Sequence, residues 1–270
     1  MSTAEDPADA ASPTALDAKK LGELAEILER ALAERPPAFG LVGVSGVGKS
    51  STVNALFRTA LPTSDTVACT KEFRDVPLDV EFSGAGATRR QVALTVIDAP
   101  GLGEDLARDP AYLRMYEDNL DRCDVVLWVM SARNRAVALD QMYLRKLSRF
   151  HDRIVLAISQ TDLVEPLDWV EKYNIPSSQQ EKNIRAIEAD RVEKLRAELG
   201  RRVPVVSYSA HRGYQLEKLF TTILRSCPPD RQWIYAGLKN FSYKDFLPSD
   251  RARKLAEHSG SLLGRLLGGQ

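Results

Sequence analysis

The sequence predicts an α/β fold with three layers, in which a mostly parallel sheet carries helices on both faces. Short runs that are apolar on both faces, such as residues 124–130 (DVVLWVM) and 153–159 (RIVLAIS), are typical of buried parallel strands. These runs alternate with longer segments of helical periodicity, which is the pattern of βαβ units. A chain of 270 residues is long enough to bury the core of such a domain.

The predicted elements divide the chain into four parts. Residues 1–15 are rich in Ala, Pro, Asp and Ser, and we expect a disordered tail. Residues 16–37 hold an amphipathic helix, 16–34, which Pro36 and Pro37 end. Its apolar face needs a partner, either the central domain or the C-terminal extension. The central domain spans 38–227, and 228–270 forms an extension that we expect to be partly helical.

Within the central domain the elements follow from the hydrophobic pattern. Residues 73–82 and 91–97 are predicted to form an antiparallel hairpin, and residues 59–71 a loop. The other expected strands are 39–42, 124–130, 153–159 and 203–208, and the expected helices are 106–120, 136–150, 181–199 and 214–226.

Charge and cysteine content exclude several classes of protein. Thirty-seven basic and thirty-seven acidic residues cancel, so no global field favours nucleic acid, and we expect no sequence-specific nucleic-acid partner. Three cysteines, Cys69, Cys123 and Cys227, have no metal-ligand spacing, and this sparse, odd number fits a reducing compartment. No apolar run approaches the roughly 20 residues that span a bilayer, and the N-terminus lacks a signal sequence. The expected location is cytoplasmic, or peripheral at a membrane.

The most informative stretch is 39–57, FGLVGVSGVGKSSTVNALF. An apolar strand leads into the pattern Gly-x-x-x-x-Gly-Lys-Ser at Gly43, Gly48, Lys49 and Ser50, and a helical spacing follows. Glycines let successive N–H groups point into the turn, and the helix directs its positive end at the same point. Lys49 adds a charge for the outer phosphates, and the Ser50 hydroxyl is a ligand for Mg²⁺. The stretch predicts a nucleoside triphosphate site.

Four further motifs follow in order. They are Thr70 in ACTKEF (Thr66 is the second choice), Asp98-Ala99-Pro100-Gly101, Ser159-Gln160-Thr161-Asp162, and Ser209-Ala210. With these motifs, residues 39–226 resemble the translation-factor-related P-loop GTPases, in particular the Era-like group and its YfjP-type members. The resemblance implies a G domain that binds GTP or GDP with Mg²⁺.

The resemblance also implies a role for each motif residue. Metal ligands would be Ser50, Thr70 and Asp98, and catalytic residues would be Lys49, Thr70 and Gly101, whose amide senses the terminal phosphate. The residues implied to bind the nucleotide are Gly43, Ser45, Gly46, Val47, Gly48, Lys49, Ser50, Ser51, Asp98, Gly101, Gln160, Asp162, Ser209 and Ala210.

Base selection is assigned to Asp162, since a carboxylate can accept two hydrogen bonds from the guanine N1 and N2 edge. The alternative is that Asp162 only caps the helix after the strand. Ser159 and Gln160 stand where the family usually has asparagine and lysine, so some contacts should be lost and guanine affinity weakened. The Ser209-Ala210 backbone would support the base at its O6 atom.

Hydrolysis is expected to be slow. Ras-like enzymes place a water-orienting glutamine directly after the Asp-x-x-Gly motif, and this chain has Leu102 there. An activating group would then come from rearrangement, self-association or a partner; four arginines are candidates, Arg58, Arg74, Arg133 and Arg135. Gly46 occupies the position at which some Era-like enzymes have a potassium-binding asparagine, so we do not predict potassium activation.

Three functions remain open. The first is a GTP-hydrolysing molecular switch. The second is a self-assembling or membrane-associated scaffold, with a homodimer through the G-domain face, or a membrane or protein partner held by leucines and arginines of the C-terminal extension. The third, an ATP-using enzyme, is disfavoured by Asp162 and Ser209-Ala210.

Overall fold

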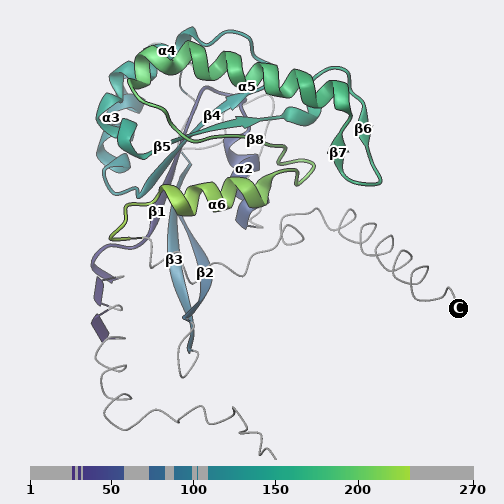
Figure 1. Cartoon of the computed structure of the whole chain (residues 1–270). Coiled ribbons are helices and arrows are strands. Elements are labelled where there is room, and N and C mark those ends of the chain that lie inside the picture. The colour runs from purple at the N-terminus through teal and green to yellow at the C-terminus, as the bar shows by residue number, and fades with distance from the viewer. Residues whose placement is uncertain are drawn as a thin grey trace, which may run out of the picture.

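A computed structural model describes residues 26–27, 30–31, 33–57, 73–82, 88–98, 102 and 109–231, and only the backbone of strands 73–82 and 88–98. Figure 1 shows the whole chain. The described residues of the expected N-terminal helix, 26–27, 30–31 and 33–34, are helical. The expected loop at 59–71, the C-terminal extension beyond 231, Thr66, Thr70 and Cys69 lie outside the described residues. No helix in the described part is both long and apolar enough to cross a membrane.

The core of the described domain is a six-stranded sheet with strand order β2-β3-β1-β4-β5-β8. Strand β2 pairs with β3 in an antiparallel manner, and all the other pairs are parallel. The strands are β1 (Ala38–Val42), β2 (Phe73–Phe82), β3 (Thr88–Asp98), β4 (Val125–Ser131), β5 (Ile154–Ser159) and β8 (Val205–Ser207). The carboxyl ends of the parallel strands therefore meet at one edge, where ligands bind in open α/β sheets.

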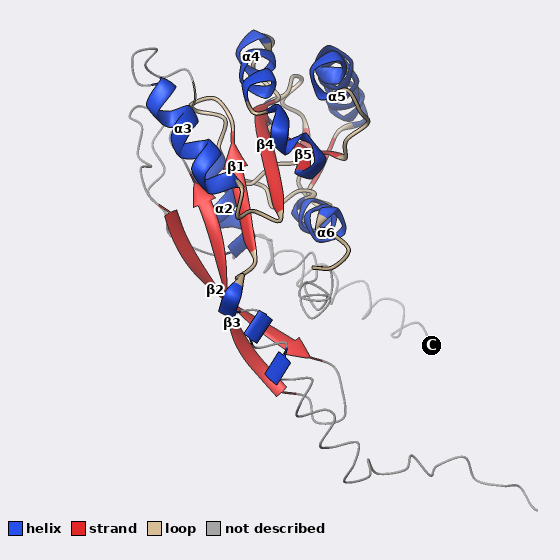
Figure 2. Ribbon diagram, turned by 90° about the vertical axis from the view of Figure 1, so that its left-hand side faces the viewer, coloured by secondary structure: helices blue, strands red, loops and turns tan. Residues whose placement is uncertain are grey.

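Helices cover both faces of this sheet, which confirms the predicted three layers (Figure 2). The helices are α2 (Lys49–Phe57), α3 (Asp109–Leu120), α4 (Ala138–Lys146), α5 (Ser178–Leu199) and α6 (Leu216–Ser226). Alternate residues of β4 face opposite sides: Leu127 and Val129 pack with α2 and α6, whereas Trp128 and Met130 pack with α3, α4 and α5. Because helices cover both faces of β4, every residue along this strand is buried, and the strand is apolar almost throughout.

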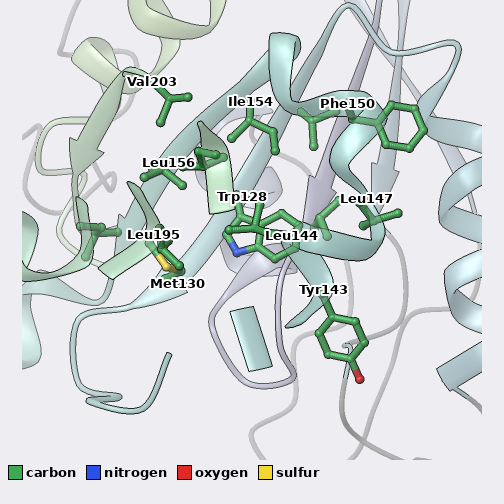
Figure 3. Packing of buried hydrophobic residues seen from close by; sticks show 14 of the residues in the cluster. Trp128, Met130, Tyr143, Leu144, Leu147, Phe150, Ile154, Leu156, Leu195 and Val203 are labelled. Atoms are coloured by element: carbon green, nitrogen blue, oxygen red, sulfur yellow. The ribbon is translucent and has the colours of Figure 1, made fainter. Parts of the chain in front are cut away.

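Figure 3 shows the second of these two core layers. Trp128, Tyr116 and Tyr143 are its largest side chains, and all three are fully buried. The Trp128 indole Nε1 donates a hydrogen bond to Asp140 Oδ1 over 2.9 Å, so the polar end of the ring has a partner inside the core. This contact fixes the first turn of α4 against β4.

The structure differs from the predicted elements most clearly in two helices and in one hairpin. The helix predicted over 136–150 ends at Lys146, and a 3₁₀ segment, Ser148–Arg153, follows it. Leu147 and Phe150 are buried in the core, so the apolar spacing continues past the end of the α-helix. The helix predicted from about residue 181 begins at Ser178, where the Ser177 hydroxyl accepts a hydrogen bond from the Gln180 N–H. The segment before it contains an unpredicted hairpin, β6 (Trp169–Val170) and β7 (Ile175–Pro176).

A buried ion cluster lies at the opposite edge of the sheet, where β1 and β4 begin. The Asp124 carboxylate is fully buried and accepts hydrogen bonds from Arg231 Nε and Nη2, over 3.0 and 3.1 Å, and from Arg35 Nη2 over 3.2 Å. Arg231 Nη2 also donates to the carbonyl oxygen of Arg35. The cluster therefore joins the segment before β1 to the segment after α6.

Candidate nucleotide-binding site

The loop between β1 and α2 is shaped like a phosphate cradle. Lys49, in the first turn of α2, is largely buried, with 8% of its surface exposed. Its Nζ folds back over the loop and donates to the carbonyl oxygens of Gly43 and Val44, over 3.0 and 3.2 Å. A lysine charge is thus held at the centre of the turn, as the sequence pattern predicts.

Other side chains hold the carbonyl groups of residues 46, 47 and 48. Gln160 Nε2 donates to Gly46 O over 3.2 Å, and the Ser159 hydroxyl donates to Val47 O over 2.6 Å. Within α2, the Thr52 hydroxyl donates to Gly48 O over 2.7 Å.

This anchoring decides where the amide groups point. In a planar trans peptide, the C=O of one residue and the N–H of the next point in opposite directions. Because the carbonyls of 46, 47 and 48 face the surrounding protein, the N–H groups of 47, 48 and 49 face the other way. Three consecutive donors at a helix N-terminus, with a lysine beside them, form an anion site.

Two glycines of the motif are required by this geometry. A Cβ on Gly43 would lie 2.2 Å from the carbonyl oxygen of Val129, so β4 passes too close for any side chain. Gly48 has φ +88°, a backbone conformation that side chains rarely adopt. Packing against β4 therefore requires the first glycine of the pattern, and the backbone conformation requires the second.

The segment after β3 runs beside this loop. Strand β3 ends at Asp98, which is in register with Leu41 of β1. Leu102 N donates to Gly43 O over 3.3 Å, and Ser45 N donates to Leu102 O over 3.4 Å. The Leu102 side chain is fully buried in the core, so it cannot contact an attacking water. The structure describes only the backbone of Asp98, and Gly101 lies outside the described residues.

The loop after β5 carries the motif that the sequence predicts to recognise the base. Gln160 has φ 59°, an unusual conformation for a residue other than glycine. Its Nε2 reaches Gly46, and its Oε1 accepts a hydrogen bond from the Ser131 hydroxyl over 2.5 Å. Both replacements therefore contact the phosphate loop, and the expected loss of contacts to the base stays a prediction.

Asp162 lies in a short 3₁₀ turn, Thr161–Leu163, and is half-buried. Helix α5 begins sixteen residues later, and Ser177 is its N-cap. Asp162 therefore does not cap the following helix, and the alternative raised from the sequence is wrong.

The loop after β8 lies next to the loop after β5, since Thr161 N donates to Tyr208 O over 3.3 Å. Ser209 is fully buried, and it exchanges two backbone hydrogen bonds with Tyr214, each 3.1 Å long. The β6–β7 hairpin supports this loop, since the Trp169 ring packs edge-on against Tyr214 and Asn174 Nδ2 donates to Arg212 O. Ala210 is half-buried, and His211 is exposed.

The donor set for a metal ion is small. No cluster of three or more His, Cys, Asp or Glu side chains suitable for a metal occurs among the residues that the structure describes. Mg²⁺ in nucleotide sites is bound through one or two protein oxygens together with substrate phosphates and water. Ser50, half-buried at the start of α2, fits such a ligand.

Sequence reasoning missed the residues behind the loop. Thr52 Oγ1 lies 2.6 Å from the hydroxyl of Tyr208, which is fully buried, and burial raises the pKa of that hydroxyl well above its usual range. This contact joins the end of β8 to α2. In the sequence, the only indication of this contact is a threonine four residues after Gly48, within the predicted helix.

Comparisons with known proteins agree with this geometry. The family described as "50S ribosome-binding GTPase" matches residues 38–160. "Uncharacterized protein YfjP" of Escherichia coli (strain K12) is 30% identical over 238 residues, covering 86% of this chain and 75% of YfjP. "Uncharacterized protein YkfA" of the same organism is 37% identical over 151 residues, covering 52% of this chain and 48% of YkfA.

Two solved structures share the fold at 20% sequence identity. One is Era in complex with MgGDPNP and nucleotides of 16S ribosomal RNA, with a TM-score of 0.51 over 71% of this chain and 57% of that chain. The other is Era from Aquifex aeolicus bound to GDP·AlF4⁻, with a TM-score of 0.52 over 71% of this chain and 56% of that chain.

Proposed function

Because this chain belongs to the Era-like P-loop GTPases, as a relative of YfjP, we propose that it binds GTP with Mg²⁺ and hydrolyses it slowly to GDP and phosphate. The two nucleotide states would differ at residues 63–74 and 98–108, so that the protein acts as a molecular switch. Lys49 and the amides of 47–49 would bind the β- and γ-phosphates, Ser50 and Asp98 the metal ion, and Asp162 the guanine edge.

The observation that supports this proposal best is the pair of contacts from Ser159 and Gln160 to the phosphate loop. The two contacts hold the phosphate loop next to the loop that carries Asp162. A nucleotide with its phosphates on Lys49 would then have its base within reach of Asp162.

Calorimetry tests the proposal directly. Titration of GDP and of a non-hydrolysable GTP analogue with Mg²⁺ should give tight binding, and ADP should bind far more weakly, since adenine lacks the N1–H and N2–H donor pair. Replacing Asp162 by Asn should shift preference towards xanthine nucleotides. Tighter binding of ADP than of GDP, or an unchanged preference in the D162N variant, would contradict the assignment.

A nucleotide-controlled scaffold is the second candidate. It is favoured by large exposed apolar residues in the segment that follows Asp162, at Leu167, Tyr173 and Ile175. We propose the cytoplasm, or the cytoplasmic side of a membrane, for either function. Vesicle flotation of the full chain with each nucleotide tests the membrane alternative.

A further inference from the structure

The segment between β5 and α5 contains the β6–β7 hairpin, which lies at the N-terminal end of α5 (Figure 1). Its two strands pair in an antiparallel manner. Ser177 N, just before α5, donates to Asp168 O over 2.9 Å, so the base of the hairpin is closed as well. The hairpin is therefore a folded unit, and its contacts can fix the position of a neighbouring loop.

Asn174 connects this hairpin to the loop after β8. Its side chain is largely buried, and both ends of its amide group have partners. Oδ1 accepts a hydrogen bond from Trp169 Nε1 over 3.1 Å, and Nδ2 donates to Arg212 O over 2.8 Å. Arg212 lies in the middle of the 209–214 loop, whose first and last residues exchange two backbone hydrogen bonds. One side chain thus joins the hairpin to the backbone of that loop.

Side chains from both segments surround this hydrogen bond. The Arg212 guanidinium group lies over the Trp169 ring, 5.1 Å from its centre, and Arg212 Nη1 donates to Glu171 Oε1 over 2.5 Å. The other contact of Trp169 is with Tyr214, edge-on, with the ring centres 5.3 Å apart. The hairpin therefore holds the 209–214 loop at its middle and at its end.

Backbone conformation sets the same part of the molecule apart. Among the residues that the structure describes, three residues other than glycine have a positive φ: Gln160 at 59°, Asn174 at 52° and Gln215 at 59°. They lie in the loop after β5, in the hairpin and directly after the 209–214 loop. Such conformations cost free energy, persist where the surrounding structure fixes them, and cluster at functional sites.

The start of α5 holds the loop of Asp162. Gln180 is fully buried in the first turn of this helix, and its Nε2 donates to Val164 O over 2.8 Å and to Asp162 O over 3.4 Å. The hairpin and the start of α5 follow each other in the chain. Both loops that the sequence assigns to the base are therefore positioned from one continuous segment, 165–180.

We propose that the β6–β7 hairpin holds the 209–214 loop at the O6 edge of the guanine base, and that this contact determines how slowly GDP is released. The N–H groups of the loop can donate to O6 only while the loop keeps its position. Asn174 and Trp169 are positioning residues, because they act on the base through the loop. The inference rests on the proposed GTPase function.

The first experiment measures the release of fluorescently labelled GDP from the full chain when unlabelled GDP is added in excess. Asn174→Gly removes the side chain but keeps the positive φ, which glycine adopts without strain. Release should be faster by about threefold to tenfold, the effect of one lost hydrogen bond. Trp169→Phe keeps a ring against Tyr214 without the Nε1 donor, so its release rate should lie between those of Asn174→Gly and the wild type.

Ser177→Ala is the matched control, since it lowers stability beside the same hairpin by removing the N-cap of α5. It should leave the release rate unchanged.

Two analogues of GDP distinguish a positioned loop from a general loss of structure. In 6-thio-GDP a sulfur atom, which is a weaker acceptor, replaces O6, whereas IDP lacks the 2-amino group that Asp162 would bind. In Asn174→Gly, the preference for GDP over 6-thio-GDP should fall by about threefold or more. The preference for GDP over IDP should stay at its wild-type value. A purely structural role would lower the affinity for all three nucleotides equally and change neither preference.

An unchanged release rate in Asn174→Gly would overturn the inference. So would faster release in which both preferences stay the same or both fall alike. Tight binding of GDP by the wild type would then leave the proposed function standing, whereas no binding of GDP by the wild type would remove both.

Discussion

Ser159 and Val47 are 112 residues apart in the chain, yet the Ser159 hydroxyl donates to the Val47 carbonyl oxygen over 2.6 Å. The same hydroxyl lies 3.0 Å from Met130 O, and Ser159 is buried. One side chain of β5 thus reaches both the phosphate loop and β4. This contact joins the loop after β5, which is predicted to select the base, to the loop that is predicted to bind phosphate.

Removing this contact should weaken both stability and nucleotide binding. Ser159→Ala leaves the Val47 carbonyl without its buried donor, which should lower the free energy of unfolding by about 1–3 kcal/mol. The loop should also lose its fixed amide orientation, so GDP affinity should fall. Urea unfolding and calorimetry measure the two effects.

Ser177→Ala is the matched control for this change. It removes the N-cap of α5, so it should cost about 1 kcal/mol of stability without affecting GDP affinity. Ser159→Asn supplies an amide N–H donor in place of the hydroxyl, so it should recover part of the GDP affinity. Equal GDP affinity in the Ser159→Ala variant and the wild type would show that the contact does not shape the loop.

Gly43→Ala adds only one methyl group, but it should distort the phosphate loop strongly. The new Cβ would lie 2.2 Å from the backbone oxygen of Val129, which β4 holds in place, so the loop itself must move. We expect a loss of about 1–3 kcal/mol of stability and a strong decrease in GDP affinity, measured as above.

The control for Gly43 is a glycine with open space around it. Gly200 ends helix α5 with φ +62° and has no atom within 4 Å of an added Cβ. Gly200→Ala should cost only the backbone strain, about 1 kcal/mol, and should leave GDP affinity unchanged. If both variants bind GDP equally well, the close approach to β4 is not the reason why the motif has a glycine at position 43.

Asp140 should make stability depend on pH. Burial raises the pKa of its carboxyl group to about 6, although Trp128 and Arg191 oppose the shift. The unfolded value is about 3.9, so the folded state holds the proton more tightly, and stability falls as pH rises from about 4 to about 6. The loss is about 3 kcal/mol for a shift of roughly two units.

Asp140→Asn tests this dependence, because it keeps an acceptor for Trp128 and cannot ionise. The difference in unfolding free energy between this variant and the wild type should be small near pH 4 and should grow in favour of the variant up to about pH 6. Other titrating groups cancel in that difference. A difference that stays constant with pH would contradict the assignment to Asp140.

The sequence predicted the strands of the sheet well because burial on both faces makes each one an apolar run. It failed at Trp169–Pro176, where two strands of two residues carry no alternation long enough to recognise. It also extended a helix past Lys146, since Leu147 and Phe150 continue the apolar spacing in a 3₁₀ segment.

Within the site, the local motif predicted Lys49 and its glycines, because a strand, turn and helix next to each other determine that geometry. Two of the donors that hold the loop come from the end of β5, and Tyr208, after β8, contacts Thr52 behind the loop; no local pattern relates Ser159 to Val47 or Tyr208 to Thr52. Only the sheet order, with β5 and β8 on the same side of β1 as β4, brings those residues to the loop.

The cluster around Asp124 should contribute strongly to stability. Arg231→Met removes two hydrogen bonds to a fully buried carboxylate, which keeps the Ala38 N–H and Arg35, whose side chain is 46% exposed. Breaking a buried ion pair from one side typically costs about 3–5 kcal/mol, and we expect about 3 kcal/mol here because Arg35 remains. Urea unfolding of the full chain measures the change.

Two further variants distinguish the cost of disturbing a buried charge from the cost of losing any arginine. Arg145→Met removes an exposed pair with Glu198 and should cost less than about 1 kcal/mol. The double variant Asp124→Asn with Arg231→Met should be more stable than Arg231→Met alone, since no buried carboxylate charge is left with fewer donors than it has in the wild type. If the double variant were less stable by the sum of both single changes, the two side chains would not be energetically coupled, and the segments before β1 and after α6 would not be held together by this ion pair.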